Sequence, residues 1–127
     1  MTVNLTATDK PAIEAVIGDT VGIPLEFVEG AAETPVNFAA GDILRIELFD
    51  GAGASVQSWQ STGSGTITFT AGSNLATINQ LATDLANLLD GFPYRCEIVR
   101  KNAAAQYRTY TLDASFIGRK RRMGTFS

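Results

Sequence analysis

The chain has 127 residues, of which 45% are hydrophobic and 18% are charged, a balance typical of one globular domain. It contains no histidine and one cysteine, Cys96, which excludes the commonest general base, the commonest zinc ligand and a disulfide framework. The net charge of -3 is uneven, with eleven acidic and two basic side chains before residue 95, and two acidic and eight basic ones from there onward. An acidic body with a basic end favours docking onto copies of itself or onto an acidic partner.

Residues 1–12 have neither the basic start nor the long apolar run of a signal peptide, and no stretch approaches the about 18 apolar residues of a membrane span. We therefore expect the protein to fold in the cytoplasm. We also expect residues 1–12 to form an N-terminal arm. The next stretch, residues 16–30, reads VIGDTVGIPLEFVEG. Its Gly-Asp-Thr turn is followed by another apolar run and no lysine, which predicts a tight turn between two strands rather than a phosphate-binding loop.

Strands are predicted where apolar and polar side chains alternate. Between Asp42 and Asp50, the residues Leu44, Ile46 and Leu48 alternate with charged ones, as in a strand with one buried face. Shorter strands separated by glycine-rich turns are predicted over residues 55–62 and 66–70.

The segment from Thr77 to Gly91 breaks this period. Asn79 or Thr77 is suited to cap the start of a helix, and Gly91 with the proline that follows it is suited to end one. We predict a short helix over residues 79–90 that bridges two sheets. Its four leucines have the i, i+4, i+7, i+8 spacing of an amphipathic helix: Leu81, Leu85, Leu88 and Leu89.

Two more strands are predicted near the end, joined by a hairpin loop at residues 101–105. In all, about seven short strands and one helix predict an all-β fold, a single antiparallel β-sandwich over residues 13–118. Residues 119–127 lack periodicity and are expected to form a basic tail. Of the two strands near the end, the one before the hairpin loop carries Tyr94, Cys96 and Ile98 on one face. The one after the loop carries Tyr110, Leu112, Ala114 and Phe116 on one face.

Few residues are left for chemistry. Glu26, Glu29 and Glu33 lie near one loop, but no calcium-loop spacing is present, so solvated positions are favoured over a catalytic or metal role. Cys96 has no histidine to activate it and is expected to be a buried structural thiol. We therefore expect no catalytic residue, no cofactor and no metal site.

Three aromatic residues could serve recognition: Trp59, Phe49 and Tyr107. They could stack on a sugar, as aromatic platforms of carbohydrate-binding sandwiches do, or they could fill the core or a subunit contact. The pattern favours the core or a contact and keeps glycan stacking as the alternative.

The densest charge run is Arg119, Lys120, Arg121 and Arg122. It could be a solvated tail, an arm that docks onto an acidic neighbouring subunit, or a weak nucleic-acid contact. Docking would explain the uneven charge, and the stretch from Met123 to Phe126 would add apolar anchors.

Five stretches follow one another along the chain: GDTVGIPLEF at 18–27, PVNFAAGDILRIELFD at 35–50, GTITF at 65–69, LLDGFPYRCEIV at 88–99 and TYTLDASFIG at 109–118. In order and spacing they resemble the small immunoglobulin-like β-sandwich of tailed-bacteriophage virion proteins. That family includes the N-terminal module of upper-baseplate and receptor-binding assembly proteins.

The resemblance implies a non-enzymatic structural protein of the virion that mediates assembly in the tail or baseplate, or connects fibres to the particle. The alternatives are a capsid decoration or head-fibre protein, and a glycan-binding module. We expect a homo-oligomer that contacts other virion proteins, not nucleic acid or membrane, and that is assembled in the host cytoplasm. The expected partner-binding residues are Arg119, Lys120, Arg121, Arg122 and Phe126.

Overall fold

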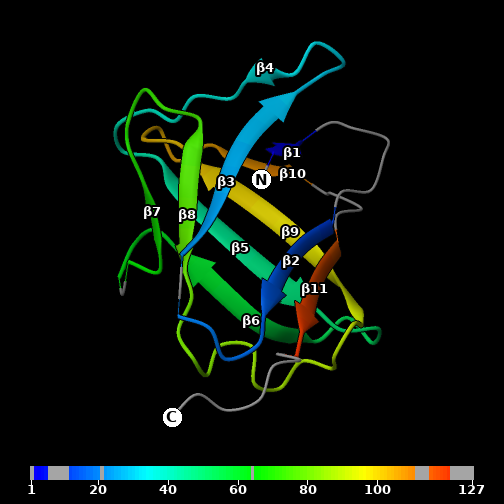
Figure 1. Ribbon diagram of the computed structural model, residues 1–127. Coiled ribbons are helices and arrows are strands. Elements are labelled where there is room, and N and C mark those ends of the chain that lie inside the picture. Colours follow the sequence, from blue (N-terminus) through cyan, green and yellow to red (C-terminus); the bar gives the residue numbers. More distant parts are fainter. Residues whose placement is uncertain (1, 6–11, 21, 64, 111–114, 121–127) are drawn as a thin grey trace.

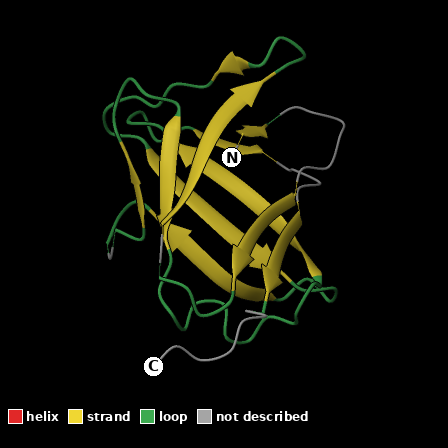
Figure 2. Cartoon of the chain, in the orientation of Figure 1, coloured by secondary structure: helices red, strands yellow, loops and turns green. Residues whose placement is uncertain are grey.

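The computed structural model describes residues 2–5, 12–20, 22–63, 65–110 and 115–120. These residues form eleven β-strands and no helix, so the all-β expectation is confirmed and the strand count is higher than predicted (Figures 1 and 2). The strands belong to two sheets.

The first sheet has the order β1-β3-β8-β7, with β4 paired to the end of β3. In Figure 1 its long strands β3 and β8 lie in front of the second sheet. Its strands are β1 (Thr2–Asn4), β3 (Gly22–Glu29), β4 (Thr34–Pro35), β7 (Ile67–Phe69) and β8 (Leu75–Asn79).

The second sheet has the order β2-β11-β9-β5-β6, with β10 paired to β9 beyond the reach of β11. Its strands are β2 (Ala12–Val16), β5 (Ile43–Phe49), β6 (Ser55–Gln60), β9 (Pro93–Lys101), β10 (Tyr107–Tyr110) and β11 (Ser115–Arg119).

Both sheets are mixed, which corrects the expectation of antiparallel pairing alone. Strand β1 pairs in parallel with β3, placing Val3 opposite Phe27, and β2 pairs in parallel with β11, placing Ile13 opposite Phe116. The first two strands lie in different sheets, so each pairs with a strand that is distant in sequence. Alternation within a strand does not specify such pairing.

The core lies between the sheets, and the predicted alternation produces it. Leu44, Ile46 and Leu48 of β5 are buried while Arg45 is exposed, which confirms the prediction for this strand. Strand β9 follows the same rule. One cluster joins side chains of both sheets, among them Leu25, Phe27, Ile78, Leu44, Ile46, Trp59, Tyr94, Cys96, Ile98 and Phe116.

The helix predicted over residues 79–90 is wrong. Asn79 ends β8, and residues 82–87 form successive turns. The amides of Asp84, Ala86 and Leu88 each donate to the carbonyl three residues earlier, Leu88 N to Leu85 O at 3.0 Å. Leu85 and Leu88 are buried, whereas Leu81 and Leu89 are exposed. Successive turns, and not a helix, therefore bring two of the four leucines into the core.

Parts of both expected arms belong to the sheets. In the segment 1–12, residues Thr2–Asn4 form β1 and Val3 is fully buried. At the other end Arg119 is the last residue of β11. The predicted side-chain positions Leu112 and Ala114 lie outside the described residues.

Candidate functional site

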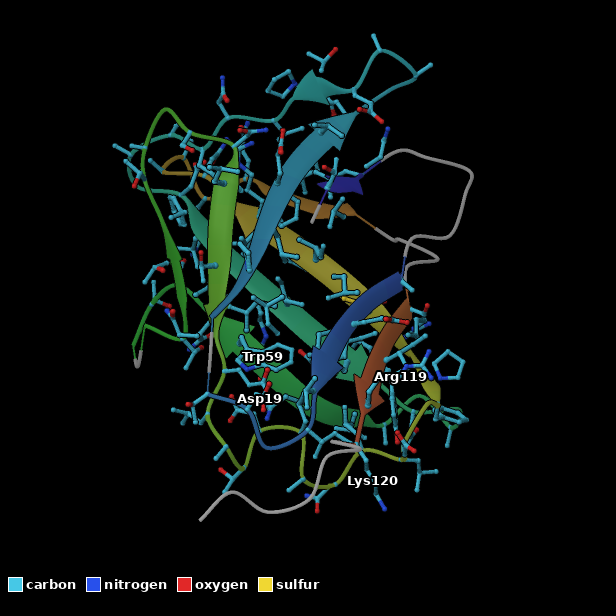
Figure 3. The ribbon with its side chains drawn as sticks, in the orientation of Figure 1. Asp19, Trp59, Arg119 and Lys120 are labelled. Atoms are coloured by element: carbon cyan, nitrogen blue, oxygen red, sulfur yellow. The ribbon has the colours of Figure 1, made fainter. Side chains whose placement is uncertain are left out.

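Arg119 and Lys120, at the end of β11, are bonded to three other residues of the fold. Arg119 Nη2 is 3.0 Å from Glu14 Oε1, and the Arg119 carbonyl accepts a hydrogen bond from Ile17 N at 2.8 Å. Lys120 N donates to Asp90 Oδ1 at 2.8 Å. Figure 3 shows Arg119 and Lys120 together at this end of the molecule. The other predicted partner-binding residues, Arg121, Arg122 and Phe126, lie outside the described residues.

Beside this point an exposed turn projects from the fold. Phe92 N donates to Leu89 O at 3.2 Å, and Gly91 N donates to Gly118 O at 2.8 Å, which ties the turn to β11. Gly91 has a φ of 76°, a backbone conformation that favours glycine. Leu89 is 65% exposed and Phe92 is 39% exposed, so this turn presents two large apolar side chains to solvent.

Tyr94 contacts the same turn through a hydrogen bond and a ring contact. Its hydroxyl oxygen accepts a hydrogen bond from Leu89 N at 2.9 Å, and its ring lies 4.8 Å from that of Phe92 in an edge-on contact. The sequence predicts Tyr94 only on a buried strand face. The available signal was its position two residues before Cys96 and just after the turn.

A groove of about 480 Å³ lies next to this turn. Its walls are the residue 50–53 turn between β5 and β6, together with Phe49, Phe92, Pro93 and Arg95. The Arg95 guanidinium lies 4.9 Å from the centre of the Phe49 ring and 3.5 Å from Glu97. We call this concavity the Phe92 groove. Its aromatic and proline walls beside a cationic side chain suit an apolar or aromatic side chain of a peptide.

The three aromatic residues considered for glycan stacking do not form one platform. Trp59 is 2% exposed and packs on Phe116 with ring centres 5.5 Å apart, so its ring faces cannot contact a sugar (Figure 3). Phe49 lies in the Phe92 groove, whereas Tyr107 is 69% exposed and near Lys101 on the β9–β10 hairpin. Along β9 these two sites are six residues apart, or roughly 20 Å.

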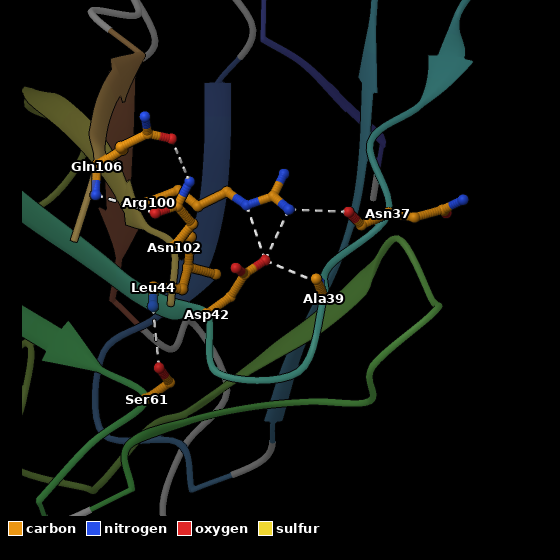
Figure 4. Close-up of polar contacts among 8 residues, drawn as sticks. All are labelled: Asn37, Ala39, Asp42, Leu44, Ser61, Arg100, Asn102 and Gln106. Atoms are coloured by element: carbon orange, nitrogen blue, oxygen red, sulfur yellow. Dashed lines mark hydrogen bonds and ion pairs between the residues drawn. The ribbon is translucent and has the colours of Figure 1, made fainter. Parts of the chain in front are cut away.

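A buried ion pair at the far end of β9 was not found from the sequence. Asp42 Oδ2 is 2.6 Å from Arg100 Nη2 and also accepts from Ala39 N at 2.8 Å (Figure 4). Arg100 Nη2 donates to Asn37 O at 3.1 Å and its guanidinium lies over the Phe38 ring. These contacts fasten the residue 37–42 loop to β9.

Cys96 and the residue 18–20 turn occupy structural positions. Cys96 is buried, and burial followed by the charge of Glu97 raises the pKa of its thiol from 9.0 to about 12, which keeps it protonated at neutral pH. Within the described residues no three His, Cys, Asp or Glu side chains gather as a metal site. Gly18, Asp19 and Thr20 turn the chain from β2 toward β3. In the same residues there is no helix that could cross a membrane.

The fold has a known counterpart. The N-terminal domain of phage TP901-1 ORF48 superposes with a TM-score of 0.61, over 94% of this chain and 95% of that one, at 13% sequence identity. At that identity the likeness concerns the fold. No family model matches the sequence, and no curated protein matches it.

Proposed function

We propose that this chain is a non-enzymatic structural module of a tailed-phage virion, which assembles with copies of itself and with tail or baseplate proteins, or connects fibres to the particle. The observation that carries the proposal is the likeness to a phage domain over nearly the whole length of both chains.

The strand order supports an immunoglobulin-like type. The order β1-β3-β8-β7 corresponds to strands A-B-E-D of the immunoglobulin fold. The order β11-β9-β5-β6 corresponds to strands G-F-C-C′, with β2 alongside β11. Tyr94, at the start of the F strand and two residues before Cys96, bonds through its hydroxyl to the backbone upstream, as the tyrosine corner of such domains does.

Part of the exposed apolar surface also supports assembly. Leu89 and Phe92 are exposed beside Lys120, where a basic and partly apolar segment continues the chain. Subunit contacts commonly combine aromatic anchors with arginines, and charge complementarity sets their register.

The test is incorporation into particles. Deleting residues 121–127 keeps all of β11, whereas a cut at Gly118 would remove its last two residues. We expect the truncated protein to keep its thermal transition and to be lost from purified particles. Replacing the same seven residues with a neutral Gly-Ser segment controls for chain length. Normal incorporation of both variants would contradict the assembly role of this segment.

A further inference from the structure

We propose that the Phe92 groove is the receptor for the C-terminal segment, residues 121–127, of a neighbouring copy of this chain, with Phe126 as the side chain that enters it. The inference rests on the proposed assembly function and adds to it the surface that the segment contacts.

The groove matches this segment in chemistry. Phe49, Phe92 and Pro93 supply an apolar floor, and Phe92 is 39% exposed although it is a large aromatic residue. In the segment RRMGTFS, Phe126 and Met123 are the two apolar side chains of matching size. An aromatic anchor that fills a pocket is the usual centre of a small interface.

Charge also bears on the match. The segment begins with Arg121 and Arg122. Asp50 lines the groove and Asp90 lies beside Lys120 N, while the Arg95 cation in the groove wall is 3.5 Å from Glu97. Pairs of this kind at a rim contribute little to affinity, but they raise the association rate and fix the orientation.

A neighbouring copy fits better than the segment's own body. Arg119 and Lys120 are bonded to Glu14 and Asp90 at the end of β11, so the chain is anchored to its own body just before the segment begins. The basic run that begins at Arg119 contrasts with the acidic part of the chain before residue 95, which favours docking onto a second copy.

The arrangement is head-to-tail, because the segment and the groove are different surfaces of one subunit. Such contacts close into rings or continue as filaments, depending on the rotation between neighbours. A ring or a filament is what the proposed role in a tail or baseplate needs.

The test is cross-linking between two differently tagged full-length variants, Ala52→Cys in the wall of the groove and Thr125→Cys beside Phe126. Cys96 is buried and its pKa is raised to about 12, so it does not compete for a maleimide reagent at neutral pH. With a short bismaleimide we expect a covalent heterodimer of the two chains. The matched control replaces Ala52→Cys by Ala104→Cys, which is also an exposed alanine and lies on the β9–β10 hairpin.

The expected result is several-fold faster cross-linking at position 52 than at position 104, and loss of the difference when Phe126→Ala is added. A chain with both Ala52→Cys and Thr125→Cys should give dimers and higher species. Equal rates at positions 52 and 104, or a product cross-linked within single chains, would overturn the proposal.

A second measurement is independent of cysteine chemistry. In sedimentation experiments Phe92→Ala and Phe126→Ala should each weaken self-association by about tenfold or more, whereas Tyr107→Ala should not. Unchanged association in both groove variants would refute the inference, and circular dichroism checks that they fold. If particles still need residues 121–127, the assembly function stands without this groove.

Discussion

The indole N–H of Trp59 donates a hydrogen bond to Asp84 Oδ2 at 2.9 Å, so a core side chain of β6 fixes the segment that follows β8. The same oxygen accepts from Leu81 N at 2.9 Å, and the Asp84 carbonyl accepts from Gln57 Nε2 at 2.7 Å. These bonds hold residues 81–84 in a turn against β6, where the leucine spacing alone predicts a helix.

Asp84→Ala should lower the free energy of unfolding by about 1–3 kcal/mol, because the buried indole N–H loses its acceptor. Urea denaturation followed by fluorescence measures the change, since Trp59 is the single tryptophan of the chain. The control is Glu26→Ala on the exposed face of β3, which should leave the midpoint nearly unchanged. Equal midpoints for the two variants would contradict the role assigned to Asp84.

Tyr94→Phe should destabilise the fold by about 0.5–1.5 kcal/mol, because Leu89 N loses a partner while the ring stays packed. Tyr107→Phe removes a hydroxyl from a side chain that is 69% exposed and is the matched control, with no expected effect. The comparison is made by thermal and urea unfolding. A Tyr94→Phe protein as stable as the control would show that this hydrogen bond contributes nothing.

Arg100→Ala should cost about 3–5 kcal/mol, because it leaves the Asp42 carboxylate buried without its cation. The Asp42 side chain is only 1% exposed, so it depends on the Arg100 guanidinium for its countercharge. Arg45→Ala breaks an ion pair with Glu47 in which the arginine is 49% exposed, and it should cost no more than about 1 kcal/mol. Similar unfolding midpoints for the two variants would argue against the buried pair as a fastening of the 37–42 loop.

The stability of the protein should fall as pH rises above about 9, in part through Cys96. In the folded chain the thiol stays protonated until a pKa of about 12, whereas in the unfolded chain it ionises near 9.0 and so favours unfolding between these values. Cys96→Ala should therefore show a shallower loss of stability from pH 9 to 11 than the wild type, although it is less stable at pH 7. Parallel curves for the two proteins would contradict this.

The sequence predicts the buried side chains correctly where one face of a strand is buried and the other is exposed to solvent. The predicted alternation is present in β5, at Leu44, Ile46 and Leu48, and in β9, at Tyr94, Cys96 and Ile98. In both strands these side chains belong to the core that joins the two sheets. Pairing is a property of two segments, so the parallel contacts of β1 and β2 could not be derived from either segment alone.

The candidate surface could be predicted only in part. The basic residues Arg119 and Lys120 stand out in composition, but their position beside the Leu89–Phe92 turn depends on a contact across 30 residues, Lys120 N with Asp90 Oδ1. Trp59 was assigned to either core or surface because burial of an aromatic side chain depends on packing. The acceptor that allows it to be buried, Asp84, is 25 residues away.

The parallel pairing of β2 with β11 has a mechanical consequence. Five residue pairs, from Ala12 with Ser115 to Val16 with Arg119, join the two strands side by side. A pull applied at the start of β2 and at the end of β11 acts along both strands in opposite directions, so the ladder is loaded in shear and its hydrogen bonds share the force. A tension applied between β2 and β11 is therefore resisted by the whole ladder at once, and the hydrogen bonds do not open one at a time.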